Sequence, residues 1–428
     1  MIKMRKKKLE LAAMLVLACC FAVRPRVALA QSGTGQAALN DASAKGSLAV
    51  YQNFSKYPPE SRPLDSTNWD LLHPWSTDAS WSPLMPQAVV RQMDSLRATG
   101  ATDEEVLRSV TLPSPLPRYR FDLNKSTLTG THDEFRAKLS MAVSQDSETP
   151  LSFHISKAEL IGDDDFGSPK LGAVPFSCEA SGASCTFRWK APSEQKQFWG
   201  MLSLVVTGTA PGIPGEFVVR QPFFSSPMTA GKFTGQFQER IENGSLVIDA
   251  GVEVKRRMAC FVSANLFSAD HVSADHVSGD RGIPTHHAER RLIVDPSMKT
   301  ISFSFFGKIF RDGGHEGAFR LQDLKGQCEN LSYPPEWFID SVAHKAELQA
   351  LQNKPAAVRE PSKIYFEYAE HTYTTQRYAG AVFSDQEWQS PERTRKLEML
   401  KRAAAEMDNP TMTQKMDQKK KQLQQPIQ

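Results

Sequence analysis

Side chains of the kind that bind transition metals are concentrated in one short stretch of the sequence. The pentapeptide Ser-Ala-Asp-His-Val occurs twice in succession, and two more histidines follow. Neutral imidazoles and carboxylates can bind zinc, copper or nickel, and a flexible loop would let them converge. A perfect duplication is also typical of a surface loop lengthened by insertion, which costs little stability, and we favour this interpretation. The candidate metal ligands are Asp270, His271, Asp275, His276, His286 and His287.

A second acidic cluster has the character of a calcium site. Asp163, Asp164 and Asp165 lie between Gly162 and Gly167, and their carboxylate oxygens are hard ligands. The twelve-residue spacing of an EF-hand is missing. A charged turn between two strands is therefore the favoured interpretation.

Catalytic signatures are missing from the sequence. It has no G-x-S-x-G elbow, no H-E-x-x-H, no phosphate-binding P-loop and no G-x-G-x-x-G after a strand. His315-Glu316 begins like a zinc motif, but Phe319 stands where the second histidine would be needed. We therefore expect a protein that is not an enzyme and uses no cofactor. Because the carboxylate pairs of glycosidases have no fixed spacing, a hydrolase with an unrecognised site remains an alternative.

Other side chains suggest binding rather than catalysis. Trp69, Trp75 and Trp81 could stack on sugar rings, although we favour the interpretation that they fix an extended arm to a neighbouring domain. The runs Lys255-Arg256-Arg257 and Arg290-Arg291 could bind phosphate or lipopolysaccharide. Charged strand edges that discourage aggregation explain these basic runs equally well.

The first 30 residues predict export. Five basic residues precede an apolar run from Leu9 to Val23, and Ala28-Leu29-Ala30 has the form of a signal-peptidase cleavage site. The run is shorter than the roughly 20 residues that span a bilayer. We expect a periplasmic or secreted protein. The alternative is a lipoprotein cleaved before Cys19.

Net charge gives no indication of a nucleic-acid partner. Without the seven basic and one acidic residues of positions 1–30, 44 basic and 47 acidic residues remain. The basic character of the full sequence therefore comes from the export signal, and nothing in the overall charge suggests a nucleic-acid partner. No later stretch is apolar enough to span a membrane, so we expect no membrane span in the mature chain.

Cysteine number agrees with an oxidising compartment. Four cysteines lie outside the signal segment, and three pairings are possible. We favour Cys178 with Cys185 and Cys260 with Cys328, because each pair then lies within one expected domain.

Period-two alternation predicts two β-sandwich domains. The first covers residues 113–224, with candidate strands at Ser177 to Trp189, Trp199 to Thr207 and Glu216 to Phe223. Residues 225–230 form a short connection. The second domain covers residues 231–331, where apolar residues alternate from Leu246 to Val254 and from Met258 to Leu266. A loop is expected between Leu266 and Ile301, and a turn at Arg311 to Gly314.

Several motifs of the second domain resemble a known family. They are Lys232-Phe233-Thr234-Gly235, Asn243-Gly244-Ser245-Leu246, Ala264-Asn265-Leu266-Phe267 and Phe305-Phe306-Gly307-Lys308-Ile309. Together with Tyr373-Thr374-Thr375, they resemble the choice-of-anchor X type of immunoglobulin-like domain in exported proteobacterial proteins. The resemblance implies an immunoglobulin-like fold and export. It implies no catalytic residues.

The remaining segments flank the two sandwiches. Residues 31–112 are expected to form an irregular arm with short helices at Pro86 to Arg97 and after Thr102. Residues 332–408 form a C-terminal extension, whose strand docks on the second domain and whose last helix begins at Ser390-Pro391. The Gln- and Lys-rich tail, residues 409–428, is expected to be disordered.

The sequence thus predicts a mainly β protein, built from two tandem immunoglobulin-like sandwiches and outside the cytoplasm. The favoured function is a non-catalytic binding or scaffolding protein of the bacterial envelope, with other envelope or extracellular proteins as partners. A carbohydrate- or metal-binding protein is the first alternative.

Overall fold

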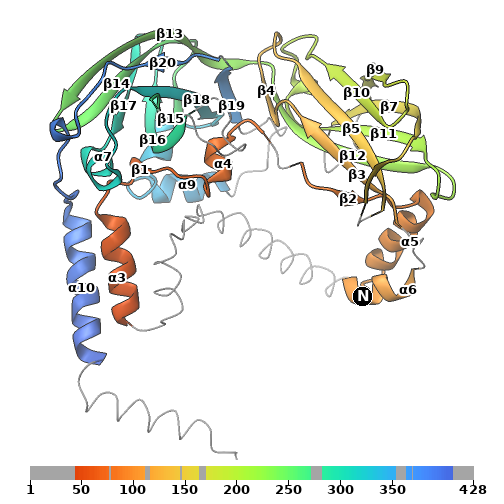
Figure 1. Cartoon of the computed structure of the whole chain (residues 1–428), viewed down its shortest axis with the longest axis horizontal. Helices are drawn as coiled ribbons and strands as arrows, with labels where there is room; N and C mark the ends of the chain where they lie inside the picture. Colours follow the sequence, from red (N-terminus) through yellow and green to blue (C-terminus); the bar gives the residue numbers. More distant parts are fainter. Residues whose placement is uncertain are drawn as a thin grey trace, which may run out of the picture. The chain divides into compact units, whose positions relative to one another are not determined.

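The structure is a computed structural model that describes residues 44–76, 79–110, 116–144, 147–162, 170–270, 282–352, 363–368 and 370–407. It divides into two compact units (Figure 1). The larger unit covers residues 59–386 and holds both sandwiches. The smaller combines residues up to 58 with those from 387 onward. The signal segment, the acidic cluster at 163–165 and the tail from 408 lie outside the described residues.

The first sandwich has two sheets of alternating buried and exposed side chains. In β5, for example, Phe135, Ala137 and Leu139 are buried while Arg136 and Lys138 are exposed. The buried faces of both sheets share one hydrophobic core. One sheet has the order β2 (Ser82–Pro83), β3 (Arg118–Leu123), β5 (Phe135–Ser144), β10 (Ser184–Trp189), β9 (Phe176–Cys178), with β6 (Ser147–Pro150) beside β5. The other has the order β4 (Thr127–Thr129), β12 (Phe217–Ser226), β11 (Gly200–Thr209), β7 (His154–Gly162), β8 (Lys170–Ala173).

The second sandwich-like body is built from one continuous sheet in the described part of the chain. The sheet folds over on itself, so that both halves of it pack on a single core. Strand β16, near one end of the sheet, contacts β17 at the other end. The sheet is continuous because β19 pairs with β18 on one side and, in parallel, with β13 on the other. The order is β1 (Ser61–Pro63), β16 (Ile283–Val294), β15 (Met258–Ser268), β18 (Phe319–Glu329), β19 (Lys363–Glu367), β13 (Thr229–Glu242), β14 (Ser245–Val254), β17 (Thr300–Phe305), with β20 (Tyr373–Thr374) beside β18.

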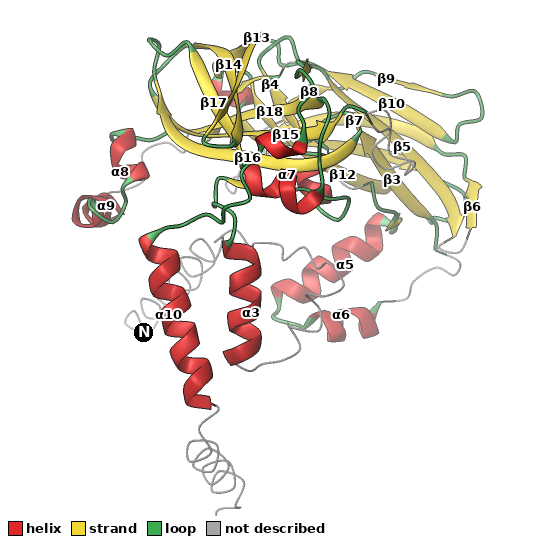
Figure 2. Cartoon of the chain, turned by 60° about the vertical axis from the view of Figure 1, so that its left-hand side comes forward, coloured by secondary structure: helices red, strands yellow, loops and turns green. Residues whose placement is uncertain are grey.

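This architecture confirms the predicted fold class, a mainly β chain with two sandwich-like bodies (Figure 2). It corrects several details. The strand expected from Ser177 to Trp189 is the hairpin β9–β10, and strand β16 runs through part of the segment expected to be a loop. The turn expected at Arg311 to Gly314 contains the end of helix α7 (Gly307–Gly313), followed by Gly314 in the left-handed conformation. The connection between the sandwiches is only Pro227-Met228, because β12 and β13 extend farther than expected.

The arm is more regular than expected. Its β1 extends the edge of the second sheet by pairing with β16. It also contains α4 (Trp69–Leu72), α5 (Gln87–Ala98) and α6 (Asp103–Ser109). Helix α6 begins with the predicted capping box, because the Thr102 side chain and the Glu105 side chain each bond to the other residue's backbone N–H.

The C-terminal extension contains two short helices before the expected strand. After β18 come α8 (Pro335–Ile339) and α9 (Lys345–Gln352), then β19, β20 and the short 3₁₀ helix η3 (Gly380–Val382). The first sandwich has a similar short helix, η1 (Lys196–Phe198). Strand β19 docks on the second sandwich as predicted, but inside its sheet rather than at an edge.

The smaller unit is a helix pair, α3 (Ala44–Ser55) and α10 (Pro391–Met407), which lie side by side in both views (Figures 1 and 2). The buried guanidinium of Arg393 donates to the Ser55 hydroxyl at 3.1 Å and forms an ion pair with Glu387. Helix α10 begins at the predicted residue. No helix among the described residues has both the length and the apolar character needed to cross a bilayer.

Candidate functional site

A cavity of about 420 Å³ lies where the two sandwiches meet. Four segments that are distant in the sequence line it: residues 72–76 of the arm, residues 124–125 after β3, residues 322–324 of β18, and residues 368 and 370–372 after β19. A smaller cavity of about 280 Å³ shares Tyr368 and His371 with it. The site therefore exists only when both sandwiches, the arm and the C-terminal extension are in place.

The arm is held at the cavity through its backbone carbonyl groups. Asn265 donates its side-chain amide to the carbonyl of Leu71 at 2.6 Å. Ser126 donates its backbone N–H to the carbonyl of Trp75, also at 2.6 Å. Between these points, the ammonium group of Lys325 donates to the carbonyl of Pro74 at 3.2 Å. Both sandwiches thus bind the same short stretch of arm.

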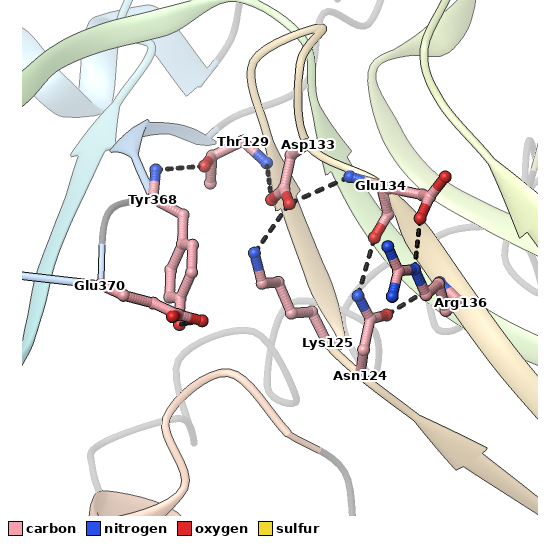
Figure 3. A network of polar contacts seen from close by, with 8 residues as sticks. All are labelled: Asn124, Lys125, Thr129, Asp133, Glu134, Arg136, Tyr368 and Glu370. Carbon is pink, nitrogen blue, oxygen red and sulfur yellow. Dashed lines mark hydrogen bonds and ion pairs between the residues drawn. The ribbon is translucent and has the colours of Figure 1, made fainter.

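The wall formed by the first sandwich is a polar network around Asp133 (Figure 3). Asp133 accepts a 2.7 Å bond from the Lys125 ammonium and a 3.1 Å bond from the Thr129 backbone N–H. The hydroxyl of Thr129 accepts a 2.5 Å bond from the backbone N–H of Tyr368. The Lys125 ammonium also lies 3.4 Å from the centre of the Tyr368 ring, a cation–π arrangement. This network ties the first sandwich to the C-terminal extension.

Burial changes the ionisation of several groups near the cavity. Burial and the nearby Glu370 carboxylate raise the pKa of the Tyr368 phenol, which donates to that carboxylate at 3.3 Å. Burial raises the pKa of Tyr365 to about 12. It lowers the pKa of Lys325, with a further contribution from the positive charge of Lys363. The tyrosines therefore remain neutral hydrogen-bonding groups at neutral pH.

A buried polar network lies on the second sandwich beneath the arm. Asn265 is 1% exposed, donates to Asp323 at 2.8 Å and contacts the ring nitrogen of His287 at 2.7 Å. The other ring nitrogen of His287 faces Glu289 at 3.4 Å, and Glu289 pairs with Arg62 of the arm at 3.3 Å. The sequence analysis gave Asn265, Asp323 and Tyr368 no role at a site, because their partners lie far away along the chain.

The three tryptophans do not offer their faces as a common sugar-stacking surface. Trp75 is only 7% exposed. The ring of Tyr368 packs edge-on against it, with the two ring centres 5.2 Å apart, and the Lys325 ammonium lies 5.2 Å from the centre of the Trp75 ring. The guanidinium of Arg118 lies over Trp81 at 4.5 Å, and Trp69 stacks on His73 at 4.8 Å. Trp75 thus fixes the arm, as the favoured interpretation predicted.

The predicted metal ligands are only partly described. His271, Asp275 and His276 lie outside the described residues. His286 and His287 are neighbours in β16, so their side chains point to opposite faces of the sheet. His286 is buried against Phe310, whereas His287 bonds to Asn265; Asp270 pairs instead with Arg377 at 2.7 Å. Within the described ranges, no three His, Cys, Asp or Glu side chains form a metal-binding group.

Both favoured disulfides are present. Cys178 is joined to Cys185 across the β9–β10 hairpin, and Cys260 is joined to Cys328 across β15 and β18. In each case the two cysteines stand directly opposite each other in an antiparallel ladder.

The comparisons with known proteins do not assign a function. No protein-family model matches the chain, and no curated protein matches it. A DUF4785 family protein from Legionella pneumophila is similar over 50% of this chain, with 12% identity and a TM-score of 0.35. The chain spans about half of that protein, 53% of its length. The FN1-FN3 domains of chicken CNTN1 match 51% of this chain and 73% of their own, with 8% identity and a TM-score of 0.19. Likenesses at this level carry no functional argument.

Proposed function

We propose that this chain is exported to the bacterial envelope or beyond it, and acts there as a non-catalytic binding or scaffolding protein. The observation that carries the proposal is the junction itself, where the polar groups around the cavity bind other parts of the same chain. The form of the first 30 residues and the two disulfides support export.

The bonding of the cavity's charged groups supports a non-catalytic role. The Lys125 ammonium is held by Asp133, and the Asp323 carboxylate accepts from Asn265. The Tyr368 phenol, with its raised pKa, is a poor general base at neutral pH. These groups support the junction rather than facing a substrate in a reactive state.

The short connection between the sandwiches supports scaffolding. Only Pro227 and Met228 separate β12 from β13, and Tyr365 donates its backbone N–H to the Ser226 hydroxyl at 3.1 Å beside them. A junction held by the arm and by β19 would keep the outer faces of the two sandwiches at a fixed spacing. Partners are expected to be other envelope or extracellular proteins that contact both sandwiches. The resemblance to choice-of-anchor X domains remains a prediction that fits this location.

Export is tested by fractionating a Gram-negative host that expresses the full chain. The expected product begins at Gln31, lies outside the cytoplasm and has no free thiols when denatured in an alkylating reagent. An uncleaved cytoplasmic protein with four reactive cysteines beyond residue 30 would contradict the proposal. A product that begins at lipid-modified Cys19 would identify the lipoprotein alternative.

The scaffolding role is tested by comparing cross-linked products in the native host. Asn265→Leu removes one of the donors that hold the arm, so we expect it to weaken any specific cross-link that needs both sandwiches. Gln238→Leu, an exposed change in β13, is the control and should leave the cross-link intact. Turnover in a broad hydrolase screen, abolished by changing one carboxylate or histidine, would instead establish an enzyme.

Carbohydrate binding is the second candidate, and the composition of the cavity favours it. Gln322 and Glu370 line the cavity with the planar polar groups that hydrogen-bond to sugar hydroxyls. Glycan-array binding that is lost in Glu370→Gln and Gln322→Ala, but kept in Trp69→Ala, would assign a sugar to the cavity. Loss in Trp69→Ala alone would place the sugar on the exposed arm.

A further inference from the structure

Two arginines stand directly opposite each other on the outer face of the first sandwich. Arg136 of β5 pairs with Arg188 of β10 in the antiparallel ladder, and both are exposed. Side chains opposite each other in such a ladder have Cβ atoms roughly 5 Å apart, and like charges there are destabilising. Two opposed arginines on an exposed face lower the stability of the sandwich, so a function of the pair would explain why both are present.

Glu134 is the carboxylate that lies near the three cations Arg136, Arg188 and Lys190. Arg136 forms an ion pair with Glu134, the hydrogen bond drawn in Figure 3. This hydrogen bond, followed by the positive charges of Arg136, Lys190 and Arg188, lowers the pKa of Glu134. Within the part of the chain that the structure describes, the side chains of Arg188 and Lys190 make no hydrogen bond or ion pair of their own. The cluster therefore carries an excess of about two positive charges.

Two of the basic residues that stand out in the sequence, Arg257 and Arg291, are bonded to other parts of the chain. Arg257 forms an ion pair with Glu336, and Arg291 donates to the carbonyl of Phe338 while its guanidinium lies 4.2 Å from the centre of that ring. These side chains hold helix α8 against β15 and β16. The Arg136–Arg188 pair has no such internal role, which makes it the better candidate for an external ligand.

We propose that Arg136, Arg188 and Lys190 form a binding site for a phosphate group. A phosphate monoester carries close to two negative charges at neutral pH, which matches the excess charge of the cluster, whereas a carboxylate carries one. The forked donors of a guanidinium pair bidentately with phosphate oxygens, and two opposed arginines can approach one tetrahedral anion from both sides. Glu134 competes with the ligand for Arg136. The site does not depend on the proposed export or scaffolding role.

The test compares matched charge variants of the full chain in buffer free of phosphate and sulfate. Inorganic phosphate is titrated by calorimetry. Binding to vesicles that contain phosphatidic acid, a lipid phosphate monoester, is compared with binding to phosphatidylcholine vesicles by co-sedimentation. Arg188→Gln should weaken binding about ten-fold, because a charge-assisted bond is lost. Glu134→Gln should strengthen it, since the competing carboxylate is gone. Arg108→Gln, an exposed arginine of α6 paired with Glu104, is the control and should bind like the wild type.

The calorimetric titration and the vesicle experiment distinguish a soluble phosphate ligand from a lipid headgroup. Binding of inorganic phosphate that depends on Arg188 indicates a soluble phosphate ligand, and binding only to anionic vesicles indicates a lipid headgroup. The proposal is overturned if neither probe binds. It is also overturned if Arg188→Gln and Arg108→Gln weaken binding equally, since the effect would then come from net charge alone. Circular dichroism and the thermal midpoint establish that each variant is folded.

Discussion

The backbone N–H of Tyr368 donates a 2.5 Å hydrogen bond to the hydroxyl of Thr129, across 239 positions of sequence. Thr129 is 1% exposed at the end of β4, and its backbone N–H is bonded to Asp133. One buried hydroxyl thus connects the first sandwich to the segment that completes the second.

Thr129→Val should remove this connection while keeping the shape of the side chain. The N–H of Tyr368 would then lack its acceptor in a partly buried position, so we expect the free energy of unfolding to fall by about 2 kcal/mol. Urea denaturation followed by tryptophan fluorescence measures the change. Thr300→Val, at an exposed position in β17, should change it little. Equal effects of the two variants would show that the bond contributes nothing specific.

Asn265→Leu should release the arm. The amide of Asn265 donates to the carbonyl of Leu71 and to Asp323, and its oxygen contacts His287. Leaving these buried partners without their bonds should lower the free energy of unfolding by about 3 kcal/mol. Hydrogen exchange should also accelerate in residues 69–76. Unchanged exchange there would mean that other contacts, such as the bond from Lys325, are enough to hold the arm.

Local patterns in the sequence predicted the elements that form from local signals. Strands β14 and β15 were visible because one face of each is buried, so apolar residues alternate along them. Helices α6 and α10 were visible from their N-terminal residues. The two disulfides followed from the domain boundaries.

Features that depend on distant contacts could not be predicted. Strand β16 carries the exposed run Glu289-Arg290-Arg291 after four consecutive buried residues, Thr285 to Ala288, so its burial does not alternate and the strand was concealed. Nothing near β19 indicates that it lies between two strands of the sheet rather than at its edge. The cavity was invisible for the same reason, because the segments that line it meet only in the folded chain.

The two disulfides should differ in their effect on stability. In the chain-entropy model, the 68-residue separation of Cys260 and Cys328 is worth about 4 kcal/mol, and the 7-residue separation of Cys178 and Cys185 about 2 kcal/mol. Replacing each pair by alanines and measuring urea denaturation compares them. Replacing Cys260 and Cys328 should lower the free energy of unfolding more than replacing Cys178 and Cys185. Both side chains of the first pair are buried, which adds to the difference. A larger loss from the Cys178 pair would show that the hairpin, not the long loop, limits stability.

His286 should make the second sandwich sensitive to acid. It is fully buried in β16, with its ring centre 3.9 Å from that of Phe310 and 6.2 Å from that of His315. Burial, followed by the charge of His315, lowers the pKa of His286 well below 6.5, and burial also lowers the pKa of His315. Below pH 6.5 the unfolded chain therefore binds protons that the native chain does not, and the free energy of unfolding falls as the pH falls.

The expected slope from His286 approaches about 1.4 kcal/mol per pH unit, and it ends where the pH reaches the folded-state pKa. His286→Leu removes the titrating group, so the urea midpoint of this variant should change less between pH 7.5 and pH 5 than that of the wild type. His154→Gln replaces an exposed histidine of β7 and should keep the wild-type pH dependence. If His286→Leu retains the full loss of stability in acid, the sensitivity arises from other groups and His286 is protonated without cost.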